Sequence, residues 1–159
     1  MGRGQRALTT VYSELPTPWS VDLDEFGDYV AVRLQLSANT QRSYLADCRG
    51  LIDFMLRVTQ PGVDRTTIAE TDWSQLTLPL LRKWLSRDVM RGVAPATIAR
   101  HVASVRALCG WAVQTGRLAS DPSVRLQTPP AKKQLPQVVH QQQMDEVLSH
   151  LCLLYTSDA

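Results

Sequence analysis

Apolar residues recur at three- and four-residue steps through most of this chain of 159 residues. That spacing places apolar side chains on one face of an α-helix, whereas a strand shows a period of two, and no stretch of useful length alternates in that way. The sequence therefore predicts an all-α fold, with a compact four-helix domain over residues 19–120. The expected helices cover residues 20–36, 38–58, 79–90 and 96–115.

Local signals predict where these helices begin and end. Ser20 and Ser37 are expected N-caps, because a short hydroxyl side chain can accept a hydrogen bond from an unpaired N–H of the first turn. Asp22, near the first turn of the first helix, suits the positive end of the helix dipole. Pro79 fits the first turn of the third helix, where its missing N–H costs nothing. Gly116 fits the left-handed position that often follows a helix.

Proline-rich segments flank the four expected helices. Residues 1–18 are polar and interrupted by two prolines, so we expect a flexible arm. Residues 121–137 hold four prolines together with Lys132 and Lys133, which predicts an extended basic linker. A last short helix is expected to begin near Gln141.

The composition excludes several classes of protein. With 44% hydrophobic and 20% charged residues, the chain has the make-up of an ordinary globular domain. The chain contains no run of eighteen apolar residues, so the sequence predicts no membrane span. The three cysteines are widely spaced and form no C-x-x-C pair, so we expect no disulfide framework, no zinc site and a reducing, cytoplasmic location.

Basic charge is concentrated in one part of the chain. The formal net charge is only +2, but residues 91–133 contain seven basic residues and a single acid, Asp121. Such a window favours a polyanionic partner such as nucleic acid. The alternative interpretation is a solvated helix face enriched in arginine.

The fourth expected helix carries a polar face beside its apolar stripe. Thr97, Arg100, His101 and Ser104 fall at steps of three and four and share this face. If the helix lies in a major groove, these side chains can reach phosphates and base edges. Arg106 lies on the other flank of the stripe, where it can meet a backbone phosphate.

The second expected helix offers two polar faces. Thr40, Tyr44 and Asp47 share one face, and Arg42 and Arg49 share another. The favoured interpretation of Tyr44 is a half-buried packing residue and not a nucleophile, and that of Asp47 is an ion pair with a neighbouring arginine.

No catalytic or cofactor-binding constellation is recognisable in the chain. His101 has no second ligand at a metal-binding spacing, so we expect no metal site. Neither a phosphate-binding loop nor a dinucleotide fingerprint is present, so we expect no small-molecule cofactor. Trp73, Trp84 and Trp111 are expected in the core or at helix junctions.

Two stretches resemble a known family. Residues 36–54 are similar to the L-S-x-x-T-x-x-x-Y-x-x-D…F signature that opens the core-binding domain of tyrosine recombinases. Residues 94–106 resemble the fourth helix of that domain, T-I-x-R-x-(L/V)-S-x-(L/V)-R. They are followed by a run similar to the W…G…N-P…P-K…L-P-x-x-L pattern of the family, in which Asp121 replaces the usual Asn. The resemblance covers about residues 19–148, and the Xer-type recombinases and phage-type integrases match best.

The resemblance implies that the chain binds double-stranded DNA in a clamp, with the second and fourth helices in the major groove and the linker crossing the duplex. It also implies other recombinase protomers as partners, and neither a membrane nor a cofactor. The residues expected to contact DNA are Thr40, Arg42, Tyr44, Arg49, Thr97, Arg100, His101, Ser104, Arg106, Lys132 and Lys133.

The resemblance also implies where the chemistry of the family resides. Strand cleavage uses a tyrosine nucleophile assisted by arginines, a lysine and histidines in a catalytic domain that would begin near Gln134. We expect residues 138–151 to be the truncated start of that domain and this chain alone to be inactive. Tyr155 has no His-x-x-Arg before it and is not a candidate nucleophile.

The last residues invite a separate interpretation. We expect residues 152–159 to be a non-native read-through tail, because a transposon-end adapter used in sequencing libraries would encode this peptide. The alternative is a natural apolar helix that continues from Met144.

For the domain as a whole, two other functions stay open: a non-enzymatic helix-turn-helix regulator and an all-α protein-interaction domain.

Overall fold

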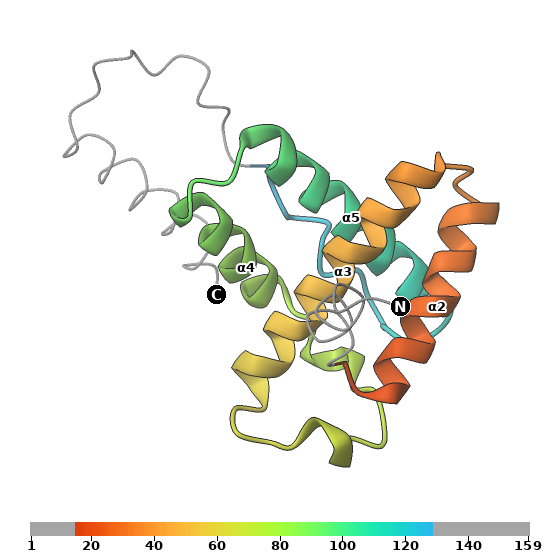
Figure 1. Ribbon diagram of the computed structural model, residues 1–159, viewed down its shortest axis with the longest axis vertical. Coiled ribbons are helices and arrows are strands. Elements are labelled where there is room, and N and C mark those ends of the chain that lie inside the picture. The colour runs from red at the N-terminus through yellow and green to blue at the C-terminus, as the bar shows by residue number, and fades with distance from the viewer. Residues whose placement is uncertain (1–14, 129–159) are drawn as a thin grey trace, which may run out of the picture.

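The computed structural model describes residues 15–128 and consists of four α-helices with two short 3₁₀ helices between the second and the third (Figure 1). No strand occurs within these described residues, so the expected all-α fold is confirmed. The elements are α2 (Thr17–Val32), α3 (Ala38–Thr59), η1 (Arg65–Thr67), η2 (Trp73–Gln75), α4 (Leu78–Met90) and α5 (Pro95–Gln114).

Helix α3 is the centre of the packing and contacts α2, α4 and α5. In Figure 1 it crosses the molecule between α2 at one edge and α4 at the other. Its residues Leu51, Ile52 and Met55 are completely buried. Each such side chain contributes about 1.5–3 kcal/mol through burial, so the apolar stripe of α3 fixes the arrangement of the other helices.

An aromatic cluster closes one end of the core. The ring centroid of Trp73 lies 5.0 Å from that of Trp19 and 5.8 Å from that of Trp111. The indole Nε1–H of Trp73 donates a 2.8 Å hydrogen bond to Asp22, which fastens η2 to α2. Trp73, Trp84 and Trp111 are all buried, so their expected place in the core is confirmed.

Several helix ends follow the local signals. The hydroxyl of Ser37 accepts a 3.2 Å hydrogen bond from the N–H of Thr40 at the start of α3. Pro79 lies in the first turn of α4, as expected. Gly116 has φ +79° and follows α5. The N–H of Arg117 bonds the carbonyl of Ala112 at 2.8 Å, which completes a Schellman motif.

The start of α2 differs from the prediction. The helix begins at Thr17, not at Ser20, and it takes in the last residues of the expected arm. Pro18 occupies the first turn, where no intrahelical N–H is needed, so the proline starts the helix instead of preventing it. Asp22 lies beyond the first turn, and its carboxylate binds side chains of other elements instead of the helix end.

The segment after α5 is packed and not extended. Ser123 and Leu126 are each 1% exposed, and the guanidinium of Arg106 on α5 donates to the carbonyl of Leu126. The packed domain therefore reaches at least Leu126, beyond the expected boundary at residue 120, because the apolar side chain of Leu126 completes the core. The expected arm over 1–14 and everything from 129 on, with Lys132, Lys133 and the segments 138–151 and 152–159, lie outside the described residues.

Within residues 15–128, none of the helices combines the length and apolar character that crossing a membrane requires.

Candidate nucleic-acid interface

Asp47 of α3 is the centre of a polar cluster between α3, α4 and α5. The residue is 6% exposed, and its two carboxylate oxygens accept hydrogen bonds from Nε and Nη2 of Arg100, both at 2.9 Å. The hydroxyl of Ser104 donates a third bond at 2.7 Å. The interpretation of Asp47 as the partner of an arginine is therefore confirmed.

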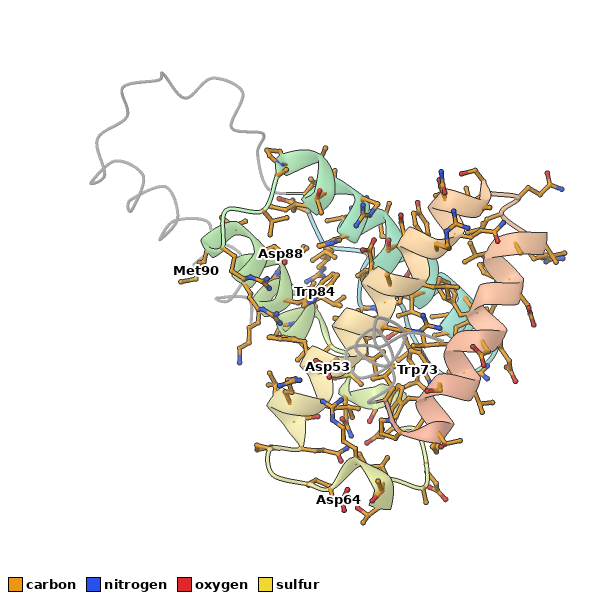
Figure 2. The ribbon with its side chains drawn as sticks, viewed as in Figure 1. Asp53, Asp64, Trp73, Trp84, Asp88 and Met90 are labelled. Atoms are coloured by element: carbon orange, nitrogen blue, oxygen red, sulfur yellow. The ribbon has the colours of Figure 1, made fainter. Side chains whose placement is uncertain are left out.

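His101 connects this cluster to α4. Its Nδ1 lies 2.6 Å from Oδ2 of Asp88, and its Nε2 lies 3.3 Å from Oδ1 of Asp47. The imidazole stacks on the ring of Trp84 at a centroid distance of 5.0 Å. Figure 2 shows Trp84 and Asp88 on the side of α4 that faces α3 and α5. Both nitrogens of His101 are thus occupied by carboxylates.

The contacts keep the cluster charged. Burial alone would raise the pKa of Asp47, but hydrogen bonds from His101, Arg100 and Ser104 outweigh burial and lower this pKa to about 2. Burial disfavours the imidazolium of His101, yet hydrogen bonds to Asp47 and Asp88 raise the pKa of His101 to about 9. At neutral pH the cluster therefore holds an imidazolium and a guanidinium against two carboxylates.

The predicted polar face of α5 is only partly at the surface. Ser104 is 0% exposed, and its hydroxyl points to Asp47. We therefore withdraw Ser104 from the expected DNA contacts, because it has no surface that DNA could touch. The side chain of His101 is 14% exposed, and that of Arg100 is 41% exposed. Thr97 is half-buried.

Arg100 combines a fixed position with an open edge. Nε and Nη2 are bound to Asp47, while Nη1 has no hydrogen-bond partner within residues 15–128. A guanidinium fixed on one edge presents its remaining donors in a defined direction. Arg100 is therefore the predicted residue on α5 that is best placed to meet a ligand.

The predicted residues of α3 fall on two sides of the helix. Thr40 and Tyr44, both half-buried, share the Asp47 face and so lie toward Arg100. Arg42 and Arg49 lie about 140–160° around α3 from Asp47, at about 100° per residue. The structure thus brings Thr40 and Tyr44 to the same side as Arg100 and places Arg42 and Arg49 on another flank.

Arg106 is exposed, but its guanidinium also holds the chain after α5 through the carbonyl of Leu126. A phosphate contact of Arg106 would therefore use the same guanidinium that already bonds the carbonyl of Leu126.

Three basic residues of α4 and its C-cap escaped the sequence prediction. Lys83, Arg87 and Arg91 are exposed at successive steps of four, and none forms an ion pair with a carboxylate in the described part of the chain. Lys83 and Arg87 are hidden in the overall charge because residues 31–90 hold eight basic and six acidic residues, whereas Arg91 is the first residue of the basic window 91–133. Asp47, Asp53 and Asp88 are three of those acids, and the fold uses them in ion pairs elsewhere. The signal that could have revealed the three basic residues is their spacing at steps of four, which places them on one face of a helix.

The exposed face of α2 has the opposite charge. Asp24 and Asp28 are exposed, and Glu25 pairs with Arg117 at 2.6 Å. In Figure 1, α2 and α4 lie at opposite edges of the molecule. The described domain is therefore acidic along one edge and basic along the other.

Residues 15–128 contain no group of three or more His, Cys, Asp or Glu side chains that could hold a metal ion.

Comparisons with known proteins agree with the architecture. The family model described as phage integrase, N-terminal SAM-like domain, matches residues 23–116. The tyrosine recombinase XerC of Mycobacterium sp. (strain JLS) is 41% identical over 126 residues, which are 79% of this chain and 39% of that protein. XerC of Mycobacterium tuberculosis (strain CDC 1551 / Oshkosh) is 40% identical over 121 residues, or 76% of this chain and 37% of that protein. The chain thus spans about two fifths of the length of these relatives. No solved structure matches it.

Proposed function

Since this chain belongs to the tyrosine recombinases through its phage integrase N-terminal SAM-like domain, we propose that the domain binds double-stranded DNA through α3 and α5. The family membership favours this function over a helix-turn-helix regulator. One observation carries the proposal: the guanidinium of Arg100 is oriented by its bonds to Asp47 and is nevertheless partly exposed at the surface.

The held guanidinium suits DNA for a physical reason. Arginine recognises phosphate and the O6/N7 edge of guanine through two parallel donors. In Arg100, part of the ordering of the side chain is already supplied by the bonds to Asp47, so less entropy is lost on binding. We propose that Arg100 contacts a base edge or a phosphate in the major groove.

The other proposed contacts surround this point. Thr40, Tyr44 and Thr97 lie on the same side of the domain and are suited to hydrogen bonds with the backbone of the duplex. Arg42, Arg49 and Arg106 are proposed to reach phosphates on the flanks. His101 is proposed to act through Asp47. Lys132 and Lys133, outside the described residues, are proposed as contacts of the linker.

We further propose that the domain is part of a recombinase that cleaves and rejoins DNA strands. The similarity to relatives that are named tyrosine recombinases supports this proposal. Other recombinase protomers are the proposed protein partners, and the cytoplasm, where bacterial DNA is found, is the proposed location.

The proposal can be tested by measuring the affinity of the purified chain for fluorescent duplex DNA over a range of salt concentrations. We expect log Kd to rise linearly with log salt, because phosphate contacts release counterions. Arg100→Ala should weaken binding by about 1–3 kcal/mol if Arg100 makes a bidentate base contact. A salt-independent affinity, or an unchanged affinity in Arg100→Ala, would contradict the proposal.

Ser104→Ala is the matched control for this experiment. It removes another bond to the same carboxylate but changes no surface. We expect Ser104→Ala to lower stability and to leave the DNA affinity of the folded protein unchanged. Equal losses of affinity in both variants would mean that Arg100 acts only through the fold.

A further inference from the structure

The exposed face of α4 carries a row of positive charges. Lys83, Arg87 and Arg91 follow one another at steps of four, and Met90 on the same face is 64% exposed. Figure 2 shows Met90 on the outer side of α4, away from Asp88. Asp88 is the one acidic residue of α4, and its carboxylate binds His101 on the inner side. The outer face therefore has no acid of its own.

Arg87 is held in place without losing its charge. The carbon centre of its guanidinium lies 5.5 Å from the ring centroid of Phe54 on α3. Phe54 is half-buried and packs against the core, so its ring is a fixed platform. A cation over an aromatic face is attracted to the ring, but the ring has no net charge with which to neutralise it. Arg87 thus remains available to an anion.

Phe54 and Asp47 belong to the same face of α3. They are seven residues apart, which is nearly two full turns and a rise of about 10 Å along the helix. Because Arg87 lies over Phe54 and Arg100 is bound to Asp47, both guanidinium groups overlie this one face. The rise between their two anchor residues on α3 is close to the width of the major groove of B-DNA, about 12 Å, which is the spacing at which a single duplex can contact both.

We propose that α4 is a third DNA-contacting element, in which Arg87, with Lys83 and Arg91, binds the sugar–phosphate backbone of the duplex held by α3 and α5. Phe54 is the positioning residue for Arg87. This inference rests on the proposed DNA binding and adds to it a surface that is independent of base sequence.

The test uses the whole chain, a fluorescent duplex of random sequence and a salt series. Arg87→Gln should lower the slope of log Kd against log salt by about one unit. The triple variant Lys83→Gln, Arg87→Gln, Arg91→Gln should lower this slope by about 2.7 units, at 0.9 for each phosphate contact. The matched control is Arg33→Gln, because Arg33 is also exposed but follows α2, which lies at the opposite edge from α4. Arg33→Gln should leave the slope unchanged.

The outcomes separate this inference from the proposed function. If Arg100→Ala weakens binding and the triple variant keeps the slope and affinity of the unmodified chain, α4 does not contact DNA and the inference is wrong. If the triple variant keeps duplex affinity but loses binding to poly-glutamate, the α4 row is a site for acidic proteins, which also refutes it. If the unmodified chain does not bind duplex DNA at all, the proposed function and the inference both fail.

Phe54→Leu tests the positioning role. Leucine keeps an apolar side chain on the core but removes the aromatic face. We expect Phe54→Leu to lower the salt slope in the unmodified chain and to have no further effect on it in the Arg87→Gln background. Equal effects in both backgrounds would show that Phe54 acts on stability alone, and circular dichroism of each variant monitors the fold.

Discussion

Asp47 and Arg100, 53 residues apart, form a two-point ion pair that joins α3 to α5. The carboxylate is buried, whereas the side chain of Arg100 is 41% exposed. The pair is therefore a packing contact on one side and a surface charge on the other. This geometry couples the stability of the domain to its proposed ligand contact.

Replacing Asp47 should therefore destabilise the domain. Asp47→Asn keeps the size of the side chain but removes the charge that faces Arg100 and His101. We expect a loss of about 1–3 kcal/mol, because the largely buried imidazolium of His101 loses a charged partner, whereas the exposed part of Arg100 can still be hydrated. Urea denaturation measures this loss, and an unchanged midpoint would show that the cluster contributes nothing to stability.

The stability of the domain should depend on pH through His101. The pKa of His101 in the folded chain, about 9, is above its ordinary value of 6.5. The stabilisation is therefore fully present below about pH 6.5 and is lost as pH rises through 9. We expect a decrease on the order of 1–3 kcal/mol over this range. Thermal unfolding between these pH values tests the expectation, and His101→Gln should abolish most of the decrease.

Two glycine substitutions should have opposite effects on stability. Gly50 lies within α3 with no atom near the position of an added Cβ, so Gly50→Ala should stabilise the domain by about 0.5–1 kcal/mol. Gly116 also has open space around it, but its φ of +79° is unfavourable for other residues. Gly116→Ala should destabilise by about 1–2 kcal/mol. Melting temperatures that move in the same direction would contradict this account.

Arg117 should stabilise the contact between α2 and the end of α5. Its guanidinium bonds Asp22 at 3.0 Å and lies 4.3 Å from the ring centroid of Trp111. Arg117→Ala should cost about 1–3 kcal/mol, and Arg117→Lys should recover only part of the loss because the planar stacking is missing. Equal stability of the lysine variant and the unmodified chain would mean that charge alone matters.

Local signals were enough for much of the fold. The N-cap at Ser37 and the left-handed Gly116 depend on one residue and its immediate neighbours, so both could be predicted. The start of α2 could not, because a proline both breaks helices and begins them, and the choice at Pro18 depends on how the chain packs. The burial of Leu126 was missed for a similar reason, since it depends on a contact with α5.

The candidate site was harder to predict than the fold. Periodicity placed Arg100 and Ser104 on one polar face, but it does not distinguish a face in water from one that pairs with another helix. In the fold, the buried Ser104 donates its hydroxyl hydrogen bond to Asp47, whereas Arg100 bonds the same carboxylate and stays partly exposed. The contact between Phe54 of α3 and Arg87 of α4 could not be predicted, because the residue pattern of each helix gives no information about its neighbour.

The opposite charges of α2 and α4 have a consequence before any contact forms. A domain with an acidic edge and a basic edge carries a permanent electric dipole, and the field around a polyanion exerts a torque on it. The domain would be turned during its approach, with α4 forward and α2 to the rear, so a larger share of collisions would begin in a productive orientation. Because counterions shorten the reach of that field to about 8 Å at physiological ionic strength, this alignment would fade as salt is added.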